Sequence, residues 1–268
     1  MTTFQAILFG CLQGLAEFLP ISSSGHLVLL KSLFGLEDVP RLFDVLLHVA
    51  TLFVVFAVFR RRIAELFAAL GRFLLRRRQE EDAPRLRLIL AIIIATFCTG
   101  VPGVFLKDLG FESRPKIVSA FLLVTAIILL VTRFLEKRES AAPEPKLPGI
   151  KEGLITGIAQ GIGVLPGISR SGITISAALF AGVSRREAGE FSFLLSIPAI
   201  LGALVLSLKD SGSLAAAVAP PALIAGLISA VITGYISLRF LLRLIQGGRL
   251  YLFALYLVPV GILGIIFL

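Results

Sequence analysis

Residues 13–26 of this 268-residue chain read QGLAEFLPISSSGH, and residues 160–172 repeat the stretch in altered form as QGIGVLPGISRSG. Each copy has Gln-Gly, a short apolar run, Leu-Pro and then Ile-Ser-x-Ser-Gly. A Gly/Ser-rich break that occurs twice in an apolar chain is typical of two half-molecules that each bring a broken helix to a shared site. The copies differ at charged positions, since the first carries Glu17 and His26 and the second carries Arg170.

The composition indicates an integral membrane protein. Hydrophobic residues make up 57% of the chain and charged residues 16%, whereas roughly a quarter of the residues in a soluble domain are charged. Nothing in the sequence indicates nucleic-acid binding. Six apolar runs are long enough to cross roughly 30 Å of hydrocarbon, and they lie near residues 43–60, 86–106, 116–134, 188–208, 218–240 and 250–268. The two repeated tracts are interrupted by Pro, Gly and Ser after about 15 residues, so they are predicted to re-enter the membrane without spanning it.

The distribution of basic residues predicts the topology. The connection at 60–87 alone holds nine Arg, and an excess of Lys and Arg marks the cytoplasmic side. Both termini are then expected to face the periplasm or cell exterior. This connection is interpreted as a solvated basic face, with contact to anionic membrane lipids as the alternative.

Three predicted spans separate the two tracts, and an odd number inverts the second half relative to the first. The predicted fold class is therefore an all-α polytopic membrane protein with six transmembrane helices and two re-entrant helix-loop-helix segments in an inverted repeat. The first repeat is expected at 1–140 and the second at 150–268, joined by a Pro-rich linker at 141–149.

Glu17 is the first candidate site residue. It follows Gln13 by four residues, so both side chains project from one face of a helix. A carboxylate at membrane depth is costly and usually lines a cavity or pathway, which favours Glu17 as a metal ligand or as a residue that orients a base. A Glu neutralised within the packing is the alternative.

Pro20 is predicted to end the first half-helix, because proline cannot donate the helical hydrogen bond. The second half-helix is predicted to begin near His26, after the loop at 22–25. A helix start offers unpaired backbone N–H groups and a positive dipole end, which together favour phosphate. The serine hydroxyls add donors and one nucleophile, the alternative being a simple N-cap. His26, three residues after Ser23, is predicted to bring its imidazole near a serine hydroxyl as a general base, unless it is only an interfacial His. His48 has no counterpart in the other half and is interpreted as structural.

Arg170 is the most informative single residue. An Arg at membrane depth cannot discharge by losing a proton, and it therefore needs an anion. Its planar fork suits bidentate binding of phosphate, and an ion pair with Glu17 is the alternative. The expected diphosphate-binding set extends this pocket to Gln13, Ser22, Ser24, Gly25, Ser169, Ser171 and Gly172.

The chain resembles the undecaprenyl pyrophosphate phosphatases of the bacitracin-resistance family over essentially its whole length. The resemblance rests on both repeated tracts and on the block EFSFLLSIP at residues 190–198. It implies a bacterial inner-membrane enzyme that removes the terminal phosphate of undecaprenyl diphosphate and so recycles the lipid carrier for peptidoglycan synthesis. It also implies bacitracin resistance, a requirement for Mg²⁺ or Ca²⁺, and a site reached from the outer side.

The resemblance implies the following site residues. The family's acidic motif corresponds to Gln13 and Glu17, and its catalytic histidine to His26. Its loop serines correspond to Ser22 and Ser23, and its phosphate-binding arginine to Arg170. Many members have Glu where this chain has Gln13, so the site has one carboxylate fewer. A Gln carbonyl oxygen is still a ligand for a hard cation.

The resulting hypothesis is metal-assisted hydrolysis of a polyprenyl diphosphate. Arg170 would hold the diphosphate, Glu17 would bind the cation or orient His26, and His26 would act as base toward either Ser23 or a water. The rival hypotheses are a lipid-phosphate transporter or flippase on the same repeat, and a structural or receptor protein. The sequence leaves the oligomeric state open, with a homodimer as one alternative.

Overall fold

The structure is a computed structural model, and it describes residues 1–36, 38–106, 109–135, 146–208, 214 and 217–268. Six of the described helices are long and apolar enough to cross a membrane, and exposed apolar side chains such as Phe97, Ile236 and Phe267 cover their outer faces. The chain is thus an all-helical, multi-pass membrane protein, as predicted. The six helices are α3 (Arg41–Leu74), α4 (Asp82–Leu106), α5 (Pro115–Thr132), α9 (Arg185–Ser207), α11 (Pro220–Gln246) and α12 (Ala254–Phe267).

Four shorter helices form the two broken pairs, namely α1 (Thr3–Phe18), α2 (Ser23–Phe34), α7 (Ile150–Ile162) and α8 (Arg170–Phe180). Helix α1 ends two residues before Pro20 and α7 ends four residues before Pro166, as expected where proline removes a helical donor. With 16 residues, α1 is the longest of the four. It measures about 24 Å at 1.5 Å per residue, which is shorter than the hydrocarbon core.

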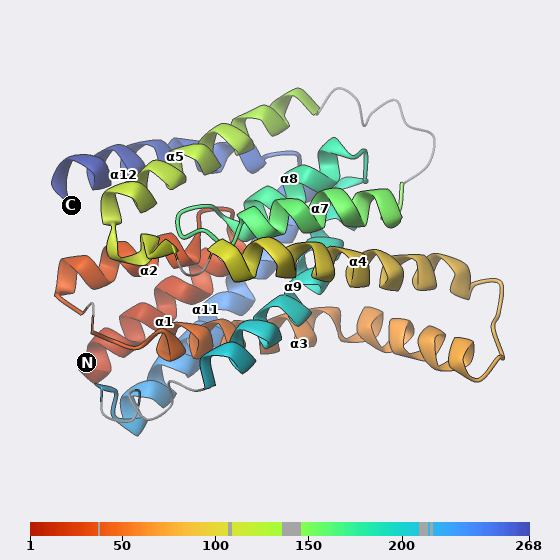
Figure 1. The fold of residues 1–268 in the computed structure, drawn as a ribbon, viewed down its shortest axis with the longest axis horizontal. Helices are drawn as coiled ribbons and strands as arrows, with labels where there is room; N and C mark the ends of the chain where they lie inside the picture. The colour runs from red at the N-terminus through yellow and green to blue at the C-terminus, as the bar shows by residue number, and fades with distance from the viewer. Residues whose placement is uncertain (37, 107–108, 136–145, 209–213, 215–216) are drawn as a thin grey trace.

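The broken helices exchange partners between the two halves of the chain. Helix α1 packs along α11, and α7 packs along α4 (Figure 1). Glycines allow both approaches: a Cβ at Gly14 would lie 2.5 Å from the carbonyl oxygen of Ala230, and one at Gly157 would lie 2.6 Å from that of Ala95. Such reciprocal pairing is what a duplicated chain requires. The division into repeats remains a prediction, and residues 141–145 of the expected linker lie outside the described residues.

Helices α3 and α9 are the two most buried of the six candidate membrane spans, and they pack on each other. Three aromatic rings fill the core beside the broken helices, with the Phe193 centroid 5.7 Å from that of Phe18 and 6.1 Å from that of Phe59. These rings are buried, and they fix the C-terminal end of α1 against both central helices. Glu17, next to Phe18, is thereby held at a defined depth.

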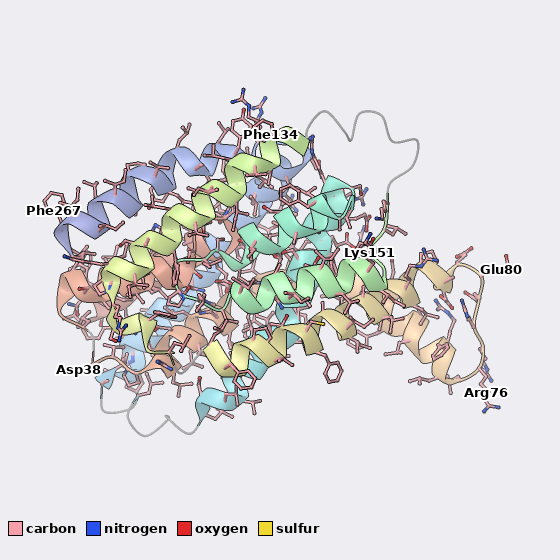
Figure 2. All side chains as sticks on the ribbon, turned by 45° about the horizontal axis from the view of Figure 1, so that its top comes forward. Asp38, Arg76, Glu80, Phe134, Lys151 and Phe267 are labelled. Carbon is pink, nitrogen blue, oxygen red and sulfur yellow. The ribbon has the colours of Figure 1, made fainter. Side chains whose placement is uncertain are left out.

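Helices α3 and α4 continue past the rest of the bundle as a hairpin. Its tip carries Arg76 and Glu80, at the opposite end of the molecule from Asp38 (Figure 2). Both chain termini lie at the end of the molecule opposite the tip of this hairpin (Figure 1). A bidentate pair between Arg72 and Asp82 closes the hairpin. The Arg-rich connection and the termini therefore occupy opposite ends, as the charge pattern predicts.

Candidate active site between the two loops

The loops that interrupt the two broken helix pairs touch each other. Gly25 lies against Gly167 so closely that a Cβ at Gly25 would be 2.8 Å from the Gly167 Cα. The backbone N–H of Gly167 donates to the Ser22 hydroxyl at 3.1 Å, and Thr125 Oγ1 donates to the Gly167 carbonyl at 2.9 Å. The two breaks, which lie 145 residues apart in sequence, thus form one buried junction.

Each loop ends at the start of a helix that is capped in the same way. The Ser22 hydroxyl accepts from the Gly25 N–H at 3.2 Å, and the Ser169 hydroxyl accepts from the Gly172 N–H at 3.1 Å. The next residue begins the helix, so Ser23 opens α2 and Arg170 opens α8. Ser23 and Arg170 therefore hold equivalent positions in the two tracts, with both helix N-termini beside the junction.

Glu17 is the centre of the polar contacts at this junction. Its Oε2 accepts from the Ser23 hydroxyl at 2.6 Å and from Gln13 Nε2 at 3.0 Å. Its Oε1 forms an ion pair with Nη2 of Arg170. Glu17 and Gln13 are buried, and they share a helix face as their spacing predicts. The ion pair, considered from sequence as an alternative to anion binding, is therefore formed within the site.

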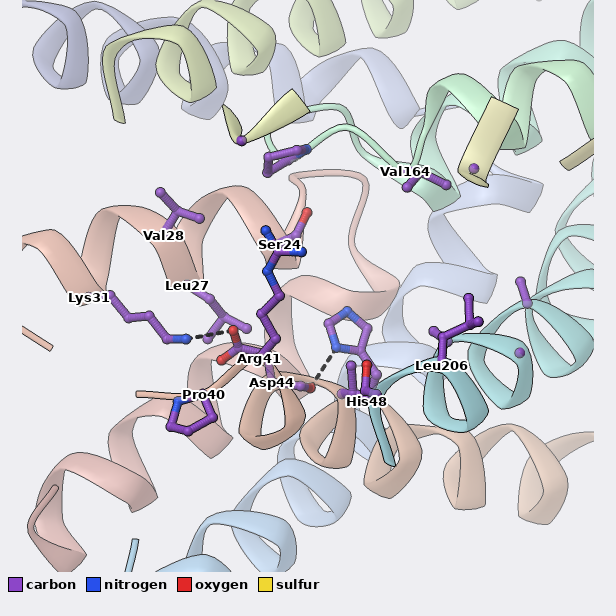
Figure 3. Close-up of a pocket in the computed structure, with 18 of the residues that line it drawn as sticks. Ser24, Leu27, Val28, Lys31, Pro40, Arg41, Asp44, His48, Val164 and Leu206 are labelled. Carbon is purple, nitrogen blue, oxygen red and sulfur yellow. Dashed lines mark hydrogen bonds and ion pairs between the residues drawn. The ribbon is translucent and has the colours of Figure 1, made fainter. Parts of the chain in front are cut away.

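His48 also belongs to the site, contrary to its interpretation as structural. Its Nε2 lies 3.2 Å from Oε2 of Glu17 and 3.4 Å from Oγ of Ser23. Its Nδ1 donates to the carbonyl oxygen of Asp44 at 2.8 Å (Figure 3), so Nε2 is the ring atom that faces the polar cluster. His48 was missed because nothing in the second tract corresponds to it. The available signal was the spacing of four residues from Asp44, which places the two on one helix face.

His26 does not make the contact predicted from its spacing. Its Nδ1 lies 2.8 Å from the carbonyl oxygen of Ser22, and its Nε2 lies 2.9 Å from the hydroxyl of Tyr256. Since a carbonyl only accepts, Nδ1 carries the proton and the tyrosine donates to Nε2. The expected approach of His26 to a serine hydroxyl is therefore wrong. One helical turn brings the imidazole back to the carbonyl four residues earlier, while the Ser23 hydroxyl turns to Glu17.

His26 instead holds a strained residue. Ser22 has φ +70°, a conformation that is uncommon for a residue with a side chain. The His26 N–H fixes its carbonyl on one side, and the Gly167 N–H fixes its hydroxyl on the other. This conformation directs Ser23 into the cluster.

The cluster lines a cavity of about 220 Å³. The polar and charged side chains on its wall are those of Glu17, Ser22, Ser23, Ser24, His48, Thr99, Gln160, Ser169 and Arg170. A larger cavity of about 920 Å³ adjoins it, sharing Ser24, His48 and Thr99 and extending past the Lys31–Asp44 ion pair (Figure 3). The larger cavity continues along apolar and small residues of α4 and α9.

Gly25, Gly172 and Ser171, three of the expected diphosphate ligands, form hydrogen bonds within the protein instead of facing the cavity. The N–H groups of Gly25 and Gly172 donate to the capping serines, so these amides are committed to the helix starts. Ser171 contacts Ser169 and the Leu19 carbonyl and is not among the cavity-lining residues. Gln13 is not among the cavity-lining residues either, whereas Ser22, Ser24 and Ser169 line the cavity together with Ser23 and Arg170.

A ready-made cluster of three or more His, Cys, Asp or Glu that could hold a metal ion is absent from the described part of the chain. The donor chemistry nevertheless suits a hard cation, because Gln13 leaves Oε1 buried with no partner in the structure beside the Glu17 carboxylate. Mg²⁺ in phosphate-processing sites often takes one or two carboxylates and completes its shell with water and phosphate oxygens.

The chain is similar over nearly its whole length to known proteins of one family. Residues 6–263 match the family model of bacitracin resistance protein BacA. The chain is 53% identical to an undecaprenyl-diphosphatase of Treponema denticola, over 98% of this chain and 96% of that protein. It is 42% identical to one of Desulfosudis oleivorans, over 97% of each chain. A third relative of that name, from Methanosphaera stadtmanae, is 41% identical over 98% of this chain and 96% of its own.

Proposed function

The chain belongs to the bacitracin resistance protein BacA family, and from this premise we propose that it hydrolyses undecaprenyl diphosphate to undecaprenyl phosphate and inorganic phosphate. Recycling of this lipid carrier supports cell-wall synthesis and confers bacitracin resistance. The observation that carries the proposal is the meeting of Ser23, Glu17 and Arg170 at one cavity, with Arg170 contributed by the other half of the chain.

Arg170 supplies the binding site for the diphosphate. Its Nη2 contacts Glu17, while its Nη1 is buried with no partner in the structure. A guanidinium with a free donor in a confined cavity suits an anionic oxygen. The starts of α2 and α8 add their positive dipole ends beside the same cavity. Together these groups would offset charge on the terminal phosphoryl group as its bond breaks.

Ser23 is the proposed nucleophile. Its hydroxyl already donates to Glu17 at 2.6 Å, so this carboxylate lies where it can take the proton as Ser23 Oγ attacks the terminal phosphorus. The bond from that phosphorus to the bridging oxygen breaks, undecaprenyl phosphate leaves, and water then hydrolyses the phosphoserine to release phosphate. His48, in contact with both Ser23 and Glu17, would keep the carboxylate and the hydroxyl aligned.

A divalent cation is part of the proposal. Glu17 and the unpartnered Oε1 of Gln13 are the oxygen donors that would hold Mg²⁺ or Ca²⁺. When bound, such an ion would neutralise charge on the diphosphate oxygens. Removal of the cation with a chelator is expected to abolish phosphate release, and added Mg²⁺ to restore it.

The larger cavity suggests how the lipid reaches the site. It passes Asp38, Pro40 and Arg41 at the end of the molecule opposite the Arg-rich hairpin. If that hairpin is cytoplasmic, the cavity faces the periplasm or cell exterior, as the substrate of a recycling enzyme requires. The apolar stretch of this cavity would accommodate the first part of the polyprenyl tail.

The test is phosphate release from a long-chain polyprenyl diphosphate by the detergent-solubilised protein. Activity in the wild type and its loss in Glu17→Ala and Arg170→Ala are expected, because each variant leaves the other charge unpaired in the cavity. Unimpaired turnover in both variants would refute the site. Scrambling of labelled lipid phosphate in proteoliposomes without hydrolysis would instead support the flippase alternative.

A further inference from the structure

Gln160 occupies in the second tract the position that Gln13 occupies in the first. Each is followed by Gly, and each lies near the end of the helix that precedes its loop. Gln13 is 0% exposed and Gln160 is 1% exposed. Of the two, Gln160 lines the small cavity directly, as Arg170 does. It is not part of the loop motif that supplied the anion-binding residues.

Hydrogen bonding fixes which way each amide points. Gln13 Nε2 donates to Glu17, a carboxylate that only accepts. Gln160 Nε2 donates to Thr99 Oγ1 at 3.0 Å. The one proton of the Thr99 hydroxyl is shared between two carbonyl oxygens, that of Ala95 at 2.7 Å and that of Gly157 at 3.1 Å. Because Thr99 can offer Gln160 only its lone pairs, the amide nitrogen must face Thr99 and the carbonyl oxygen must face away.

Both glutamines are therefore left with an acceptor that the described structure does not satisfy. The Oε1 atoms of Gln13 and Gln160 are buried without a partner, and Nη1 of Arg170 is the matching unused donor. An unsatisfied buried acceptor is costly, and in a native structure such groups often mark the place of a ligand. Of these residues, Gln160 and Arg170 line the small cavity, so a ligand there that presents both anionic oxygens and a positive centre would satisfy both.

A phosphate group meets only half of this requirement. Its unprotonated oxygens accept from Arg170 but have nothing to donate to an amide oxygen. A hard divalent cation prefers oxygen ligands, including the side-chain carbonyls of Asn and Gln, and it accompanies diphosphates in enzyme sites. A cation held together with the diphosphate therefore satisfies Gln160 and Arg170 at once.

We propose that Gln160 is a ligand, direct or through one water, for a divalent cation bound with the diphosphate, matched by Gln13 from the first tract. This inference rests on the proposed function, and it adds a ligand from the second half of the chain to those of the first. A cation held from both halves would require the two loops to remain together, which the contact between Ser22 and Gly167 already favours.

The test measures Mn²⁺ affinity by electron paramagnetic resonance on the full-length protein in detergent, with methylenediphosphonate present as a diphosphate that cannot be hydrolysed. Gln160→Met keeps the side-chain length but removes the oxygen, and it is expected to weaken Mn²⁺ binding about ten-fold. Gln160→Glu adds a charged oxygen and is expected to bind Mn²⁺ at least as tightly as the wild type.

Thr99→Val is the matched control, because it removes the tie between Gln160 and α4 but leaves the amide oxygen in the chain. Equal weakening of Mn²⁺ binding in Gln160→Met and Thr99→Val would overturn the inference. It would show that Gln160 acts only through its hydrogen bond to Thr99, which joins α7 to α4. Wild-type affinity in Gln160→Met would overturn it as well.

Hydrolysis by the same preparations separates the two claims. If the wild type releases phosphate but its Mn²⁺ affinity is independent of Gln160, the inference fails and the proposed function stands. If the wild type binds Mn²⁺ through Gln160 yet releases no phosphate, the proposed function fails and the cation site stands.

Discussion

The two loops share a serine cap on the helix that follows, and they differ in which residue adopts a positive φ. In both, a serine hydroxyl caps the following helix through the N–H three residues later. In the first loop that serine, Ser22, has φ +70°, whereas Ser169 has φ −72° and Gly167 takes the positive φ of the second loop. The positive φ strains the first loop, because Ser22 has a side chain. It does not strain the second loop, because Gly167 has none.

In the proposed mechanism this difference separates chemistry from binding. The strained loop carries Ser23, the proposed nucleophile, and His26 and the second loop hold it from two sides. The second loop carries Arg170 at the equivalent position, and Thr125 holds it through Gly167 and Ser169. The two matched helix starts would thus differ in the task of their first residue.

The largest effect is expected for Ser23→Ala. Loss of the nucleophile should lower kcat by at least about 10³-fold, measured as phosphate release from a polyprenyl diphosphate. Ser229→Ala is the control, since that hydroxyl bonds to the backbone of α1 and α11 away from the cavity. Similar rates for the two variants would show that Ser23 does not attack and that the loops differ in some other respect.

Arg170→Lys tests the second loop and should have the next largest effect. Lysine keeps the charge but loses the planar fork that reaches Glu17 and the phosphate together, so a fall in kcat/KM of about 10²-fold is expected. A rate within threefold of the wild type would indicate that charge alone, and not the two-point contact, is what the second loop contributes.

His26→Ala tests the support of the strained loop. The variant removes the ring N–H at 2.8 Å and leaves the Ser22 carbonyl only the backbone N–H of residue 26 at 3.1 Å. This weaker hold should let Ser23 drift from Glu17, and a displacement of about 1 Å costs about 10²-fold in rate. The loss should appear mainly in kcat, because Arg170 remains in place to bind the diphosphate. A change confined to KM would contradict a positioning role for His26.

The smallest effect is expected for Tyr256→Phe. This change removes the hydroxyl that contacts His26 but keeps the ring, which stacks on the imidazole with centroids 5.6 Å apart. A fall in kcat of a few-fold, about 1 kcal/mol, is the scale of one neutral hydrogen bond. A loss as large as that of His26→Ala would mean that the tyrosine itself holds the loop.

Much of this arrangement could be predicted from the sequence. The spacing of Gln13 and Glu17 predicted a shared helix face. The odd number of spans predicted that the two broken tracts would share one site, and Glu17 and Arg170 do meet there. The first prediction follows from helical periodicity and the second from the number of membrane spans, and both can be read from the sequence alone. A serine cap for α2 also follows from local rules, but the helix begins at Ser23, three residues before the start predicted near His26.

The two histidines could not be assigned in this way. The direction of the His26 ring depends on the φ of Ser22 and on Tyr256, 230 residues away. The place of His48 depends on the packing of α3 against α1, which no local pattern records. The spacing correctly placed His26 one helical turn after the serine loop. It could not tell which oxygen the ring would contact, because both the Ser22 carbonyl and the serine hydroxyls lie within one turn.

The division of labour between the loops is tested most directly by the affinity of a non-hydrolysable polyprenyl diphosphate analogue for Ser23→Ala and Arg170→Ala. If the first loop reacts and the second binds, Ser23→Ala should bind the analogue within about threefold of the wild type, while Arg170→Ala should bind it at least about ten-fold more weakly. Equal weakening in the two variants, or wild-type affinity in Arg170→Ala, would contradict the account.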